Sequence, residues 1–140
     1  MIISLNVKLV DGIYHEDDWK CEIELDEAEA FLEDLHLAIQ DAVGFGNDHP
    51  YVFFVARGSR SSRRESFPCD NSGHIETKLK ELYPLENSNR LFYRFDFGDE
   101  WIFQIGRSRK KPKEPEPGTK YPRVVSEEGV KPTQYPSAEY

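Results

Sequence analysis

Two histidines and two aspartates are the side chains in this sequence that suit metal-assisted chemistry. His36 lies beside the apolar positions of an expected helix, and His49 lies in the loop after that helix. Asp96 and Asp99 flank a Phe-Gly pair later in the chain. Neutral imidazole and carboxylate groups are suitable ligands for divalent metals. One alternative is therefore a metal-dependent hydrolase, or another enzyme, that uses His36, His49, Asp96 and Asp99.

The spacing of these residues does not support that alternative. The sequence has no HxH, HExxH or paired-cysteine pattern, and a structural histidine at the helix edge is the favoured interpretation. It also has no GxSxG motif, Walker loop or dinucleotide fingerprint, although a Ser-His-Asp arrangement needs no adjacency in sequence. We therefore expect a non-enzymatic protein without a metal or cofactor.

The letters Asp96-Phe97-Gly98 match the magnesium motif of protein kinases. A kinase also needs a glycine-rich loop, a strand lysine and an HRD motif, and this chain of 140 residues has none of them. We instead predict a hairpin turn, in which Gly98 supplies a positive φ and Asp96 accepts hydrogen bonds from backbone amides.

Basic residues gather in two stretches that could neutralise phosphates. The net charge is −8, with a balance of −11 over residues 1–56 and +5 over residues 57–113. This asymmetry predicts an electrostatic dipole, whereas the overall negative charge disfavours nucleic acid. The candidate binding residues are Arg57, Arg60, Arg63 and Arg64 in the first stretch and Arg107, Arg109, Lys110 and Lys111 in the second.

The elements that must position these residues are read from hydrophobic periodicity. Apolar residues alternate over 3–9 and 19–25, which predicts two antiparallel strands. An apolar stripe at helical spacing predicts a main helix over about 26–43, capped by Asp26 with Glu29 and ended by Gly44. The apolar run 51–56 predicts a strand that is covered on both faces.

The segment 90–107 predicts a hairpin, because its odd positions are apolar. A three-residue loop over 98–100 would pair Phe95 with Phe103 and keep one face wholly apolar. Residues 57–74 are expected to be a mobile loop, and residues 75–83 a short second helix. Residues 111–120 form a proline-rich spacer before an extended C-terminal tail, with one more strand expected at 121–125.

Two segments together resemble a known family. Residues 32–54 carry LH, AIQ, a Gly-aromatic pair and DH-x-Y-x-F, and residues 91–105 carry FDFGD-x-W-x-x-x-I. Both are similar to segments of the Ri-plasmid open-reading-frame-three-like family, the transposon passenger TnpR-like proteins of unknown function. This resemblance implies an α+β domain with links to plasmids and mobile elements, and it implies no activity. The residues that carry the resemblance are His36, His49, Tyr51, Tyr93, Asp96, Phe97, Gly98, Asp99 and Trp101.

The sequence as a whole predicts one α+β domain over residues 1–140, with both helices packed on a mostly antiparallel mixed sheet. We expect a binding module in the cytoplasm, a monomer or weak dimer that contacts no membrane. A protein partner is favoured, and nucleic acid is the second alternative. Cys21 and Cys69 are expected to be reduced thiols, with a single disulfide left open.

Overall fold

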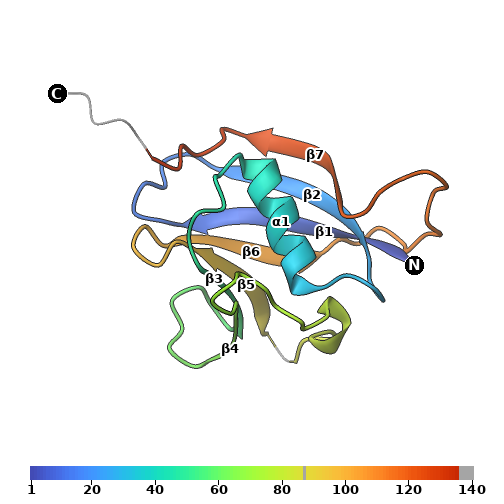
Figure 1. Cartoon of the computed structure of the whole chain (residues 1–140), viewed down its shortest axis with the longest axis horizontal. Helices are drawn as coiled ribbons and strands as arrows, with labels where there is room; N and C mark the ends of the chain where they lie inside the picture. The colour runs from blue at the N-terminus through green and yellow to red at the C-terminus, as the bar shows by residue number, and fades with distance from the viewer. Residues whose placement is uncertain (87, 136–140) are drawn as a thin grey trace.

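A computed structural model of the chain describes residues 1–86 and 88–135. Within these residues, seven strands form one sheet in the order β4-β3-β5-β6-β1-β2-β7, and helix α1 lies across one face of it (Figure 1). The elements are β1 (Ile2–Asp11), β2 (Trp19–Asp26), α1 (Leu32–Val43), β3 (Tyr51–Ala56), β4 (Arg64–Pro68), the 3-10 turn η1 (Leu79–Glu81), β5 (Arg90–Phe95), β6 (Trp101–Arg107) and β7 (Arg123–Gly129).

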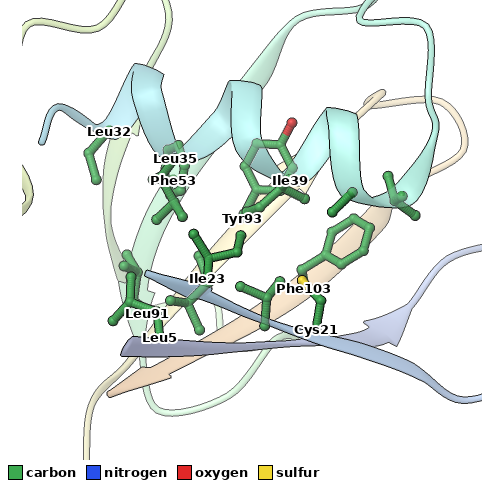
Figure 2. Close-up of a cluster of buried hydrophobic side chains, with 14 of the residues drawn as sticks. Leu5, Cys21, Ile23, Leu32, Leu35, Ile39, Phe53, Leu91, Tyr93 and Phe103 are labelled. Carbon is green, nitrogen blue, oxygen red and sulfur yellow. The ribbon is translucent and has the colours of Figure 1, made fainter. Parts of the chain in front are cut away.

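The main core lies between α1 and the sheet. The apolar stripe of α1, with Leu32, Leu35 and Ile39, packs on inward side chains of the central strands (Figure 2). These strands alternate because successive side chains point to opposite faces of a sheet. The buried inward residues that Figure 2 labels are Leu5, Cys21, Ile23, Phe53, Leu91, Tyr93 and Phe103.

A smaller apolar cluster lies on the opposite face of the sheet. Phe54 and Phe92 stack there with ring centroids 5.1 Å apart, together with Ala56 and Ile102. The Arg64 guanidinium lies 4.0 Å from the centre of the Phe54 ring. Strand β3 is therefore covered on both faces, as its continuous apolar run predicts.

The predicted fold class is wrong. All six strand pairings are antiparallel, so the sheet is not mixed. The described residues contain one α-helix of 12 residues and one 3-10 turn of 3 residues. The protein is mainly β rather than α+β, because segments expected to be helix or loop are used as strands and turns.

The main helix begins at Leu32 rather than near Asp26, although it ends as predicted at Gly44, whose φ is 78°. Asp26 is the last residue of β2, and its carboxylate accepts a hydrogen bond from the Ala28 amide at 2.9 Å. It therefore caps a turn and not the helix.

The short second helix expected at 75–83 is also absent, and only η1 forms in that segment. The backbone explains this difference. Leu32 donates to the Thr77 carbonyl at 2.9 Å, and Leu79 donates to the Ala30 carbonyl at 2.9 Å. These bonds hold residues 77–79 against the chain before α1, so they cannot continue a helix.

The β5–β6 hairpin has the predicted inward set but a longer loop. Phe95 pairs with Trp101 and Tyr93 pairs with Phe103, which leaves five residues in the loop instead of three. Asp96 and Glu100 have positive φ values of 63° and 54°, whereas Gly98 does not. The prediction that Gly98 supplies the left-handed position is therefore wrong.

Two segments outside the central strands contain more β-strand than the sequence predicts. The segment 57–74, predicted to be one loop, contains β4, which pairs with β3. Strand β7 covers 123–129 rather than 121–125 and pairs with β2. Residues 136–140 of the predicted tail lie outside the described residues. In the described part of the chain, no helix is long and apolar enough to cross a membrane.

Gly129 gives a direct test of the β2–β7 pairing. Its φ is 93°, and a Cβ there would overlap the Asp18 carbonyl oxygen. Gly118 has a φ of 78° and open space around it. We predict that Gly118→Ala lowers the free energy of unfolding by about 1 kcal/mol, the cost of a left-handed alanine, and that Gly129→Ala lowers it clearly more. Urea denaturation measures both, and equal losses would contradict the close approach.

Candidate functional site

Asp96 holds the β5–β6 hairpin turn together by accepting backbone hydrogen bonds. One carboxylate oxygen of Asp96, Oδ1, accepts hydrogen bonds from the Gly98 amide at 3.1 Å and the Asp99 amide at 3.2 Å. The Asp96 amide donates to the Pro50 carbonyl at 3.2 Å. The turn interpretation is confirmed in this respect. Burial raises the pKa of Asp99, and the neighbouring charge of Asp96 raises it further.

A closed ring of hydrogen bonds joins α1 to β5. The Gln40 amide donates to Tyr93 Oη at 2.9 Å, and Tyr93 Oη donates to His36 Nδ1 at 2.5 Å. His36 Nε2 donates to Asn47 Oδ1 at 2.8 Å, and the Asn47 backbone amide donates to Gln40 Oε1 at 3.0 Å. His36, Gln40 and Tyr93 are buried. These three buried side chains therefore have hydrogen-bond partners where water is excluded.

Burial keeps His36 neutral. Burial lowers the pKa of His36 to about 4, against the raising effects of its bond to Asn47 and the charge of Glu33. The imidazole also stacks on the Tyr51 ring, with centroids 3.5 Å apart and planes at 3°. Tyr51 in turn donates to the Gly73 carbonyl at 2.8 Å. The prediction of a structural histidine at the helix edge agrees with these contacts.

Above the His36–Tyr51 stack lies a cleft of about 790 Å³, which we call the histidine cleft. Its walls come from the start of α1, the loop after α1, and the loop after β4. Glu33 accepts a hydrogen bond from His74 at 2.6 Å across two of these walls, and this bond raises the pKa of His74. The chemically active side chains that line the cleft are Glu33, His36, Asp48, His49, Cys69, Asp70 and His74.

The C-terminal segment contacts Asp48 and His49, two residues that line the histidine cleft. Gln134 accepts from the Gly46 amide at 2.7 Å and donates to Asp48 at 2.8 Å. Tyr135 Oη donates to Asp48 at 2.6 Å and lies 2.6 Å from His49 Nε2. The Tyr135 hydroxyl is the main cause of the lowered pKa of Asp48. We call residues 134–135 the C-terminal strap.

The four residues of the proposed metal site are only partly brought together. His49 Nε2 lies 3.4 Å from Asp96 Oδ2, but both nitrogens of His36 are used in the ring. Asp96 and Asp99 belong to the turn. Across residues 1–86 and 88–135, no group of three or more His, Cys, Asp or Glu side chains is arranged to hold a metal ion. The metal-dependent alternative thus has no site in the described part of the chain.

The second basic stretch lies along acidic strand β2. Lys110 pairs with Glu22 at 2.7 Å, and Arg107 pairs with Glu27 at 3.1 Å. Lys113 pairs at 2.9 Å with Glu24, which is also bound by Arg123 at 2.8 Å. Arg109 and Lys111 remain exposed. The acidic and basic parts of the sequence therefore neutralise each other here, instead of forming the predicted dipole.

The first basic stretch divides in two. Arg60 pairs with Asp11 at 2.6 Å and with Glu100 at 3.6 Å. Arg57, Arg63 and Arg64 instead line a hollow beside β4.

Among the remaining residues that carry the family resemblance, Phe97 is exposed, whereas Trp101 is buried with its ring 5.1 Å from that of Phe45.

Sequence reasoning missed several residues of the site. Gln40 and Asn47 complete the ring, and Gln134 and Tyr135 form the strap. The left-handed φ of 51° at Asn47 agrees with the Gly-Asn-Asp turn in the sequence. Nothing local in the sequence indicates the strap, because its partners are 86 to 88 residues away.

The ring predicts a large cost for removing a single hydroxyl group. Tyr93→Phe leaves Gln40 Nε2 and His36 Nδ1 buried without a partner, and should lower the free energy of unfolding by about 1–3 kcal/mol. The matched control is Tyr121→Phe, because the Tyr121 hydroxyl only accepts an exposed bond at 3.3 Å from the Glu116 amide. Its loss should stay below about 0.5 kcal/mol in the same urea titration. Equal losses would show that the ring adds no stability.

Buried His36 also predicts a pH dependence. The unfolded chain protonates a histidine near its ordinary pKa, 6.5, whereas folded His36 does so at about 4. The unfolded state therefore binds more protons between these values, so stability is lost as pH falls from 6.5 towards 4. His36 should contribute roughly 3 kcal/mol to that loss. His36→Gln should give a shallower pH slope than the native chain, and an equal slope would contradict the prediction.

Comparison with known proteins supports the fold and the family. A crystal structure of the protein of unknown function MM3350 from Methanosarcina mazei Go1 is similar, with a TM-score of 0.67 and 22% identity, over 90% of this chain and 68% of that one. At this identity the likeness shows the fold alone. No curated protein matches the chain. The family model described as plasmid pRiA4b ORF-3-like protein matches residues 22–134. The transposon link and cytoplasmic location stay predictions, but the chain belongs to the plasmid pRiA4b ORF-3-like family.

Proposed function

We propose that this protein is a binding module that receives a positively charged segment of a partner protein in the histidine cleft. The observation that carries the proposal is the charge of the cleft. Glu33, Asp48 and Asp70 come from three separate segments and all line it, and no lysine or arginine is among its lining residues. His74, whose pKa is raised by its bond to Glu33, offsets only part of this negative charge. A concave site with an excess of one sign of charge favours a ligand of the opposite sign.

The cleft also offers contacts for the apolar part of a lysine or arginine side chain. Leu37 lies at its rim with 47% of its surface exposed. Long basic side chains pack their aliphatic stems on apolar surface while the charged end remains in a polar environment. Leu37 beside Glu33 thus supplies one surface for the stem and one for the charge.

The charge of the cleft favours a protein partner over nucleic acid. Carboxylates on the cleft walls repel phosphates, and Arg107, Lys110 and Lys113 of the second basic stretch are already paired with glutamates. Basic peptide segments have the required positive charge, and their extended backbone can also hydrogen bond to Asn71 and Ser72 on the wall. The enzyme alternative gains no comparable support from the described residues.

Binding of a basic probe peptide tests this proposal. A fluorescein-labelled peptide in which lysine alternates with glycine should bind saturably in fluorescence anisotropy, and its glutamate counterpart should not. Glu33→Gln combined with Asp48→Asn should weaken the lysine peptide roughly fivefold, because two partly exposed ion pairs together contribute about 1 kcal/mol.

A matched control separates the cleft from the overall negative charge. Glu16→Gln combined with Asp17→Asn removes the same charge from an exposed loop outside the cleft lining. It should leave the affinity within about twofold of the native value, since exposed charges at a distance are screened by salt. If both double variants weaken the peptide equally, the cleft is not the binding site.

A further inference from the structure

A hollow of about 530 Å³ lies beside β4, where the loop after β3 meets the segment before β5. The side chains that can donate hydrogen bonds into it include Arg57, Arg63, Arg64 and Asn89. Guanidinium groups are the donors best matched to phosphate, because each presents a planar fork of N–H groups. We propose that this hollow, the arginine pocket, binds a phosphate group of a small molecule.

One arginine of the pocket is already held in place. The Arg64 guanidinium lies 4.0 Å from the centre of the Phe54 ring, and Arg64 Nε donates to the Ser61 carbonyl at 2.8 Å. Arg64 Nη2 donates to the Ser59 carbonyl at 3.4 Å. A side chain fixed in this way loses little conformational freedom when a ligand arrives. Among the described residues, Arg64 Nη1 has no hydrogen-bond partner, and it is left to reach an anion.

The loop that carries the other two arginines is braced as well. The Ser61 amide donates to the Gly58 carbonyl at 3.2 Å, and Ser61 Oγ donates to the Arg63 carbonyl at 3.2 Å. Arg60 ties the middle of the same loop to Asp11 and Glu100. The short loop therefore keeps Arg57 and Arg63 at the edge of one hollow.

The positive charge of the pocket is only partly offset by its own carboxylates. Within residues 1–86 and 88–135, Arg57 and Arg63 form no ion pair, in contrast to Arg60, Arg107 and Lys110. Glu65 and Glu86 also line the pocket, so its charged lining is three arginines against two glutamates. This small positive excess favours a single phosphate group over a chain of phosphates, which would meet both carboxylates.

The site is independent of the histidine cleft, because the two share no lining residue. Titration with inorganic phosphate and with adenosine monophosphate, followed by amide shifts in NMR, tests it. Signals of residues 57–64 and Asn89 should shift saturably. Arg57→Ala and Arg63→Ala, both at exposed positions, should each weaken binding about tenfold, the loss expected for one charge-assisted contact.

The control variants are Arg109→Ala and Lys111→Ala, which remove the same charge from exposed positions outside the pocket. They should leave the affinity unchanged within about twofold. Tighter binding of adenosine monophosphate than of phosphate identifies a nucleotide as the source, and equal binding identifies phosphate alone. Shifts that do not saturate, or equal weakening by the pocket and control variants, would overturn the proposal.

Discussion

The need to pair polar groups inside an aromatic core shapes much of this fold. His36, Gln40 and Tyr93 are buried among rings, where an unpaired donor or acceptor costs far more than it does in water. The closed ring resolves this by making each group the partner of the next. As a consequence, Asn47 and the exit of the chain from α1 are tied to His36 and Gln40, whose side chains are in turn held by Tyr93 of β5. The floor of the cleft is fixed by the same contacts.

Folding brings the acidic N-terminal part of the sequence against the basic middle part, so that many of their charges are paired. The basic stretch after β6 lies on carboxylates of β2, and Glu24 is nearly buried between Lys113 and Arg123. Individual exposed pairs contribute little, but a row of them fixes where the long segment between β6 and β7 runs. The two surfaces proposed as binding sites are the negative cleft beside β3 and the positive pocket near the start of β4.

The sequence predicts features that depend on neighbouring residues, and it misses those that depend on distant ones. Alternation identifies β1, β2, β5 and β6 because burial follows directly from the pleat, and Gly44 marks the end of the helix. The start of the helix is missed because the isolated bridge between Phe31 and Lys78 is long-range. Likewise, His36 and His49 are identifiable as candidates, whereas their partners Tyr93 and Tyr135 are set by tertiary structure.

The order of strands in the sheet has a consequence for synthesis of the chain. Strand β1 is made first, yet one of its two neighbours is β6, and β7 at the sheet edge pairs with β2 only after that. Strand β1 therefore has an open hydrogen-bonding edge until about residue 107 has left the ribosome. An emerging chain of this kind has an unpaired strand edge during much of its synthesis, and such edges favour aggregation before folding is complete.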